Sequence, residues 1–181
     1  MAYASAAANV LNAVTKPQPA AWVSLCSQAA PIVSSAVFMA PIPTVVKIRS
    51  SRSTGSLPLL PYSSMVVNAF LWMTYGILNK DSKIWSPNAF GLFMGLIYCL
   101  QFRNNAPKNA SNLPGTMGQH ARYGSLMILF TMLTATLMDK AKASFLIGKL
   151  GVIVCVVLFA SPLSALKNVL ATKSAKSIPL P

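Results

Sequence analysis

Phe38-Met39-Ala40-Pro41-Ile42 is the stretch that decides the fold, because the chain repeats it as Phe159-Ala160-Ser161-Pro162-Leu163. Each copy lies in an apolar segment and is followed by a short basic connector and a second proline, Pro58 after the first copy and Pro179 after the second. The offset along the chain is the same for both pairs of prolines. A repeat of this kind in a strongly apolar chain is typical of a transporter built from two halves around a central site.

The composition is that of a membrane protein. Hydrophobic residues make up 54% of the 181 residues and charged residues 9%, with a mean hydropathy of +0.56, whereas soluble domains carry about 25% charged residues. The net charge of +13 does not indicate a nucleic-acid partner, because Lys and Arg lie in short connectors, where they orient helices in a bilayer. The cysteines lie in apolar segments without metal-ligand spacing, so small buried side chains are expected at Cys26, Cys99 and Cys155.

Five apolar segments are predicted to span the membrane, since about 20 apolar residues suffice. They cover residues 22–48, 59–78, 86–102, 123–138 and 143–170, and a sixth starts after Lys176. The third is expected to begin at Ser86-Pro87, an N-cap followed by a first-turn proline. The predicted division is a tail (1–20), a first three-helix bundle (21–103), a polar linker (104–122), a linker transmembrane helix (123–140) and an incomplete second bundle (141–181).

The distribution of charge predicts an orientation. Basic residues are more frequent after the first, third and fifth segments than after the second and fourth, which places the odd connectors in the cytosol and the N-terminus outside. The first and fifth segments then run in the same direction, so the two halves are expected to be parallel. The glycosylation sequon at Asn109 falls in a cytosolic connector and is expected to be unused. Gly91 and Gly95 form a small-residue face for close helix packing.

Ionisable side chains are scarce in the predicted spans. Asp81 and Asp139 are placed in connectors, His120 in the polar linker, and Lys149 near the start of the fifth segment, where it can snorkel. Proton- or sodium-coupled carriers usually hold an ionisable group within the membrane, so passive transport of a neutral solute is favoured. Enzyme activity is not expected because no nucleophile–base pair, carboxylate pair or metal cluster stands out, and neither a metal nor a cofactor is predicted.

Uncharged polar and aromatic side chains are the remaining candidates for a binding site. Asn68 and Trp72 are four residues apart and therefore share one helical face, and Asn88 lies at the start of the third segment. An indole stacks on the C–H face of a sugar, and an amide both donates to and accepts from hydroxyls. The alternative is that the tryptophan anchors the helix at the membrane interface and the asparagines only join helices.

The motifs in this order resemble the SWEET (MtN3/saliva) family of sugar transporters. The resemblance covers about residues 30–181 and rests on Ala40-Pro41, Thr44, Lys47, Ser53-Thr54, Leu60-Pro61-Tyr62, Trp72, Tyr75-Gly76, Asn88-Ala89-Phe90-Gly91, Ala160-Ser161-Pro162-Leu163-Ser164, Lys173-Ser174 and Pro179. It implies an all-α membrane protein in which two parallel three-helix bundles are joined by a linker helix. It also implies that a mono- or disaccharide crosses by alternating access.

The resemblance further implies roles for individual residues. The family's four helix prolines, which act as gates or hinges, fall on Pro41, Pro61, Pro162 and Pro179. Here Pro61 replaces the Pro58 of the internal repeat, because the family's first loop is longer. The sugar-binding positions fall on Trp72 and Asn88 with Asn68 beside them, and positions that influence sugar size fall on Ser34, Val37, Cys155 and Leu158. Tyr75 falls on a tyrosine of the extracellular gate.

The chain departs from the family in reaching only the start of the sixth of seven helices. Half of the expected pocket is therefore missing, and three hypotheses stay open. The chain is a passive bidirectional sugar uniporter or a fragment of one, a SWEET-derived structural subunit of a larger membrane complex, or a small carrier of another neutral or organic-acid solute. The expected partners are the sugar, the lipid bilayer, and further copies of the chain or a larger complex, in the plasma membrane or an organelle membrane.

Overall fold

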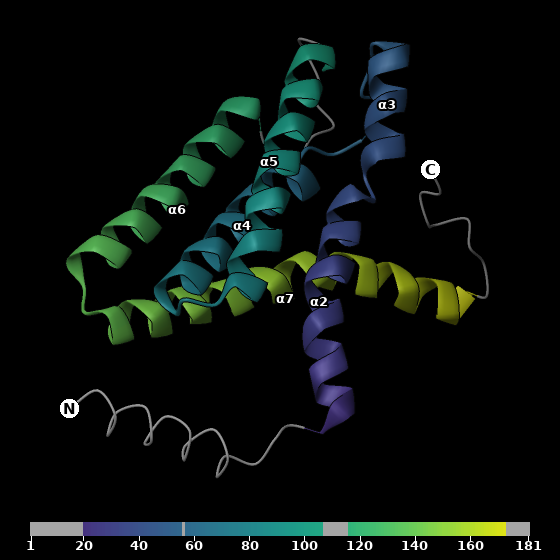
Figure 1. Ribbon diagram of the computed structural model, residues 1–181. Helices are drawn as coiled ribbons and strands as arrows, with labels where there is room; N and C mark the ends of the chain where they lie inside the picture. The colour runs from purple at the N-terminus through teal and green to yellow at the C-terminus, as the bar shows by residue number, and fades with distance from the viewer. Residues whose placement is uncertain (1–19, 56, 107–115, 173–181) are drawn as a thin grey trace, which may run out of the picture.

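Prolines and capping side chains set where the helices of this chain begin and end. The computed structural model, shown in Figure 1, describes residues 20–55, 57–106 and 116–172, with side chains as far as residue 156. These residues are helical and contain no strand, as the sequence predicted. The helices are α2 (Ala21–Met39), α3 (Ile42–Ser51), α4 (Leu60–Leu78), α5 (Ser82–Asn105), α6 (Met117–Leu137) and α7 (Lys140–Thr172).

The first predicted segment is divided by a break between α2 and α3. Pro41 and Pro43 lack the N–H groups that would continue the helix, so two helices stand where the sequence analysis placed one segment. The last turn of α2 is closed instead by the Ala40 N–H, which donates to the Val37 carbonyl at 3.2 Å. Helix α3 then ends at Arg52, whose φ of 51° is in the left-handed region.

Helices α5 and α6 begin at least four residues before the positions that the sequence analysis gave them. Helix α5 starts at Ser82 rather than Ser86, because the Asp81 carboxylate accepts the Lys83 N–H at 2.9 Å and caps it. Pro87 consequently lies inside the helix.

Helix α6 starts at Met117 rather than Tyr123, because Thr116 and Gln119 form a capping box. His120 is therefore helical rather than part of a polar linker, and its Nδ1 lies 2.9 Å from the Ser63 hydroxyl of α4.

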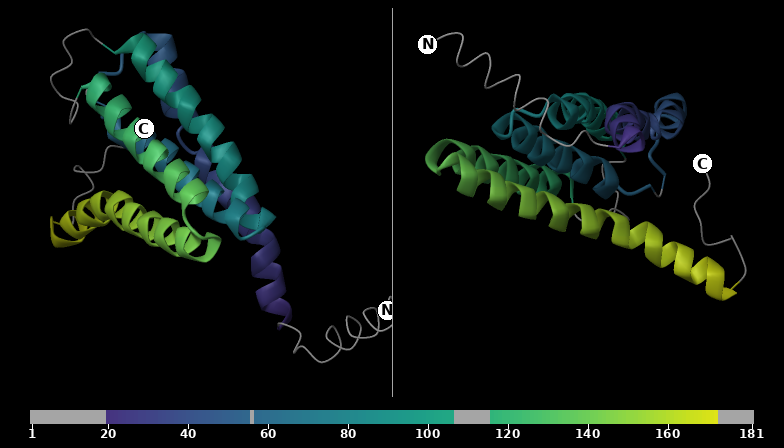
Figure 2. Two further views of the ribbon diagram at one scale, coloured as in Figure 1. Left: turned by 90° about the vertical axis from the view of Figure 1, so that its left-hand side faces the viewer. Right: turned by 60° about the horizontal axis from the view of Figure 1, so that its bottom comes forward.

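Helix α4 is the shared element of the fold. It packs against α5, α6 and α7, whereas α2 and α3 pack against α5. Figures 1 and 2 show α4 and α5 side by side, and α7 running crosswise to α2. The parallel relation expected between the two halves stays a prediction, because the second half is described only through α7, which packs on α4 and α6.

The largest buried cluster lies where α3, α4 and α5 meet. It contains three aliphatic and three aromatic residues, which are Val45, Ile48, Leu59, Tyr62, Tyr98 and Phe102. The Tyr62 ring stands edge-on to the Tyr98 ring at 5.9 Å between centroids and lies 5.0 Å from the Phe102 ring. Such aromatic pairs contribute roughly 0.5–1.5 kcal/mol beyond their buried area, so this end of the bundle is firmly held.

Glycines allow the helices to approach closely, which confirms the role predicted for Gly91 and Gly95. Both are buried, and a Cβ added at Gly91 would lie 2.5 Å from the Phe38 ring, while one at Gly95 would lie 2.9 Å from Val66. Gly76 of α4 is as closely packed, and its added Cβ would lie 2.6 Å from the backbone nitrogen of Trp85, which cannot rotate away as a side chain can.

The surface of the described residues is strongly apolar. Large hydrophobic side chains stand exposed on α2, α5, α6 and α7, with Ile32 at 73%, Leu25 at 68% and Phe145 at 65%. A surface of this kind fits contact with lipid better than contact with water. Among the described helices, the α2–α3 stretch Ala21–Ser51 is long and apolar enough by itself to cross a membrane. Cys26 on this stretch is exposed, contrary to expectation, whereas Cys99 and Cys155 are half-buried.

We expect Gly76→Ala to lower the free energy of unfolding in detergent by about 1–3 kcal/mol, because the new methyl group meets backbone that cannot move aside. The matched control is Gly124→Ala in α6, where the added Cβ would lie 3.6 Å from Val67, an ordinary contact. The control should be neutral or more stable, since alanine favours helix over glycine by up to about 1 kcal/mol. Equal stability of the two variants would contradict the close contact of α4 with α5.

Candidate functional site

One face of α4 carries the polar and aromatic side chains from which a site can be built. Asn68, Trp72, Tyr75 and Asn79 are spaced by four, three and four residues, so they lie on one side of the helix. This side meets α7, where Ser144, Gly148, Gly151 and Cys155 have the same spacing in the reverse order. The two faces therefore match residue for residue, with small side chains of α7 opposite large ones of α4.

Trp72 occupies the middle of this contact. A Cβ added at Gly151 would lie 3.0 Å from the indole, so the ring rests against the backbone of α7. The indole Nε1–H donates to the Cys155 sulfur at 3.4 Å, and the Cys155 thiol donates to Asn68 Oδ1 at 3.3 Å. The Tyr75 ring stands edge-on to the indole, with 5.5 Å between centroids. Three of the predicted site residues are thus joined in one chain of hydrogen bonds.

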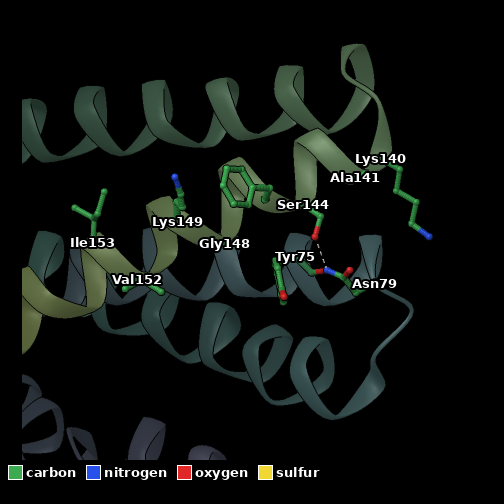
Figure 3. Close-up of a pocket in the computed structure, with 10 residues that line it drawn as sticks. Tyr75, Asn79, Lys140, Ala141, Ser144, Gly148, Lys149, Val152 and Ile153 are labelled. Atoms are coloured by element: carbon green, nitrogen blue, oxygen red, sulfur yellow. Dashed lines mark hydrogen bonds between the residues drawn. The ribbon is translucent and has the colours of Figure 1, made fainter.

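The other end of the contact is closed by a hydrogen bond between the helices. The Asn79 side-chain amide donates to the Ser144 hydroxyl at 2.8 Å and to the Tyr75 carbonyl at 2.8 Å. Figure 3 shows the bond to Ser144 beside Tyr75. Tyr75 in turn lies against Gly148, where an added Cβ would be 3.0 Å from its ring.

A groove of about 970 Å³ opens along this contact, between the end of α4 and the first half of α7. Its lining residues are Tyr75, Asn79, Lys140, Ala141, Ser144, Phe145, Gly148, Lys149, Val152 and Ile153 (Figure 3). Lys149 lies well inside α7 and not at its start, and its ammonium group is 4.3 Å from the centroid of the Phe145 ring. The groove therefore combines apolar walls with a phenol, an amide, a hydroxyl and two ammonium groups.

These groups suit binding rather than bond-breaking. Hydroxyl and amide groups exchange hydrogen bonds with a polyol, and aromatic faces stack on its C–H groups. The described residues contain no group of three or more His, Cys, Asp or Glu side chains placed to hold a metal ion. No carboxylate lines the groove.

Other predicted site residues lie apart from the groove in this structure. Asn88 is half-buried on α5, where its amide donates to the Ile84 carbonyl of the same helix at 2.8 Å. Ser34 and Val37 lie on α2, which packs on α5, and Val37 is 59% exposed. Their roles stay predictions.

The hinge prolines and the last size-determining residue fall partly outside the described side chains. Pro61 lies in the first turn of α4. Pro162 lies within α7, which is helical through it, but its side chain and that of Leu158 are outside the described residues, as is Pro179. Asn109 and the sixth segment are also outside them.

Of the residues that α7 supplies to the contact, Cys155 was predicted from the sequence, whereas Ser144, Gly148 and Gly151 were not. Ser144 and Gly148, four apart and followed by Gly151, form the same small-residue pattern that was recognised at Gly91 and Gly95. That spacing was the available signal. The bond from Asn79 to Ser144 has no local signal, because it joins residues 65 positions apart.

The Asn79–Ser144 bond can be measured by a double-mutant cycle of Asn79→Ala and Ser144→Ala in detergent-purified protein. We expect a coupling of about 0.6 kcal/mol in the free energy of unfolding, the usual size for a hydrogen bond between membrane helices. The control pairs Asn79→Ala with Ser125→Ala, an exposed serine on α6, and should be additive. A coupling no larger than that of the control would show that the bond does not hold α4 to α7.

The sequence of this chain is similar to those of known sugar transporters. Residues 24–110 match the family model described as sugar efflux transporter for intercellular exchange. The chain is 32% identical over 149 residues to the bidirectional sugar transporter SWEET11 of Arabidopsis thaliana, covering 82% of this chain and 51% of the relative. It is 33% identical to SWEET5 of the same plant, over 82% of this chain and 62% of the relative, and 30% identical to the bidirectional sugar transporter N3 of Medicago truncatula, over 82% and 55%. The chain thus spans between half and two thirds of the length of these relatives, which are named as transporters and not as enzymes.

The fold matches a solved structure as well. A eukaryotic SWEET transporter determined at 3.7 Å superposes with a TM-score of 0.73 at 20% identity, over 86% of this chain and 73% of that one. The helical membrane-protein fold expected from the sequence is confirmed by this match. The family model and the sequence identities relate the chain to the SWEET (MtN3/saliva) family, and the structural match shows that it shares the fold of a SWEET transporter.

Proposed function

We propose that this chain carries one side of a sugar pathway and works as a passive, bidirectional uniporter by alternating access. The observation that carries the proposal is the joining of Trp72, Cys155 and Asn68 across α4 and α7, next to a groove of about 970 Å³. A stacking surface and hydrogen-bonding groups converge there from two helices. The relatives named as bidirectional sugar transporters support a mono- or disaccharide as the substrate.

Passive rather than coupled transport follows from where the charges lie. Asp81 caps α5, and Asp139 pairs with Lys142 at 3.0 Å on an exposed turn, so neither carboxylate faces the groove. His120 lies in the first turn of α6 beside Ser63 and does not line the groove either. A carrier driven by protons usually holds a carboxylate or a histidine on the pathway, and the titratable groups that line the described groove are instead Tyr75, Lys140 and Lys149.

A complete pathway requires helices beyond those described. Val152, Ile153 and Val156 stand 52–64% exposed on α7, next to the groove. Further helices would cover this face, whether they come from the same polypeptide, from another copy of the chain or from a larger membrane complex. The alternative that the chain is a structural subunit predicts a stable complex and no uptake of sugar.

The membrane in which the chain works is the plasma membrane or that of an organelle.

A second candidate substrate is an organic acid, and the two lysines of the groove favour it. Lys140 and Lys149 both line the groove, and an ammonium group binds a carboxylate. Competition separates the two substrates. If uptake of a labelled sugar is inhibited by unlabelled sugars and not by small carboxylates, the substrate is a sugar. If small carboxylates inhibit it and unlabelled sugars do not, the substrate is an organic acid.

We expect Trp72→Ala to reduce the uptake of labelled sugar at least tenfold in transport-deficient cells, since loss of stacking worth about 1.4 kcal/mol is a factor of ten. Trp22→Ala is the matched control, because this tryptophan is 68% exposed on α2 and away from the groove. The control should keep normal uptake. Equal uptake by the two variants at equal surface expression would show that Trp72 does not line the sugar pathway.

We also expect uptake to be insensitive to the proton gradient, because no carboxylate lines the groove. The measurement is the final level of labelled sugar in cells with and without an uncoupler. The level should reach equilibrium with the medium in both cases. Accumulation above equilibrium that the uncoupler abolishes would show coupled transport.

A further inference from the structure

The break between α2 and α3 leaves backbone carbonyls that need donors. In an unbroken helix the carbonyls of Val37 and Met39 would accept from residues 41 and 43, but both of these are prolines. The Ala40 N–H takes over the carbonyl of Val37. The carbonyl between them, that of Phe38, accepts the hydroxyl of Tyr98 of α5 at 2.9 Å. A side chain from a neighbouring helix therefore enters the backbone of α2 at its break.

Tyr98 is held firmly enough to act in this position. Its side chain is 1% exposed, and its ring stands edge-on to Tyr62. The ring belongs to the same buried cluster as Val45 and Ile48, which are residues of α3. One side chain of α5 thus reaches both sides of the break, the last turn of α2 through its hydroxyl and the apolar face of α3 through its ring.

The direction of the Phe38 carbonyl links this bond to the angle of the break. In a straight helix a carbonyl points along the axis, toward the N–H four residues on, which here belongs to Ile42. At a kink the carbonyl tilts outward and can accept a side-chain donor. The bond to Tyr98 therefore favours the bent form, and its loss favours a straighter one.

We propose that Tyr98 is a positioning residue that sets the angle between α2 and α3 through the hydrogen bond of its hydroxyl to the Phe38 carbonyl. While the bond is made, α3 stays bent against α5 and moves with it. When the bond is broken, α3 swings about Ala40 and Pro41. The prolines allow the break, and the hydrogen bond from Tyr98 determines the angle between α2 and α3.

The angle can be measured with two spin labels in the full chain in lipid nanodiscs. One label is attached to Cys26, which is exposed on α2, and the other to Ser50→Cys, exposed on α3, with Cys99 and Cys155 replaced by Ala in every sample. Loss of one hydrogen bond should change the ratio of bent to straighter forms roughly fivefold. We therefore expect Tyr98→Phe to move population to longer distances. An unchanged distance distribution would overturn the proposal.

Two further variants separate the hydroxyl bond from general packing. Tyr62→Phe makes the same chemical change in the same aromatic cluster but away from the break, and should leave the distances unchanged. Pro41→Ala restores an N–H to the last turn, so adding Tyr98→Phe to it should have little further effect. An equal shift in Tyr62→Phe, or full additivity with Pro41→Ala, would assign the effect to packing and overturn the proposal.

The consequence for transport rests on the proposed function and is measured separately. In Tyr98→Phe the maximal rate of sugar uptake should fall severalfold, while the sugar concentration at half-maximal rate stays the same, because the groove lies between α4 and α7. Absence of uptake by the parent chain would contradict the proposed function and leave the distance measurement standing. If the distances shift in Tyr98→Phe but the maximal rate stays normal, the angle between α2 and α3 does not control the rate of transport.

Discussion

Close approach of helices through glycine is the constraint on which the rest of this structure depends. Helices in a membrane gain little from burying apolar surface against one another, because lipid is as apolar as they are. They associate through van der Waals contact and hydrogen bonds, which need short distances. In the described residues Gly76 and Gly95 bring α4 and α5 together, and Gly148 and Gly151 bring α7 onto α4. A methyl group at Gly76 or Gly95 would force its neighbour to shift, and one at Gly148 or Gly151 would lie 3.0 Å from an aromatic ring, closer than most such contacts.

The central place of α4 follows from this constraint and brings the site with it. One side of α4 is committed to α5 through Val66 and Gly76, so its remaining faces are open to α6 and α7. The face toward α7 carries Trp72 and Tyr75, and the residues of α7 opposite them are glycines. The same large-on-small contacts that fasten α7 also place an indole, a phenol and an amide beside a groove. Packing and binding therefore use one set of side chains.

The sequence predicted the helical class and the resemblance to the SWEET family, because these depend on local and periodic features. The apolar segments and the absence of an N–H at Pro41 are visible without a structure. The starts of α5 and α6 were placed too late, since Asp81 and the pair Thr116 and Gln119 cap helices from within stretches that read as polar connector. The bonds Tyr98–Phe38 and Asn79–Ser144 join residues 60 and 65 positions apart, and no local pattern encodes them.

The chemistry of the Trp72–Cys155–Asn68 chain suits a site that must open. A thiol is a weak donor and a weak acceptor, so its bonds at 3.4 Å and 3.3 Å fill the hydrogen-bonding needs of the indole and the amide at low energy. Under the proposed function, a sugar hydroxyl would be a better partner for both groups and would replace the thiol without leaving either unsatisfied. A serine at position 155 would hold the same groups more tightly and raise the cost of that exchange. The contact between α4 and α7 is therefore weak at Trp72 and stronger at its end, where Asn79 bonds to Ser144. Groups in the middle of the interface can exchange hydrogen-bond partners while the Asn79–Ser144 bond stays formed.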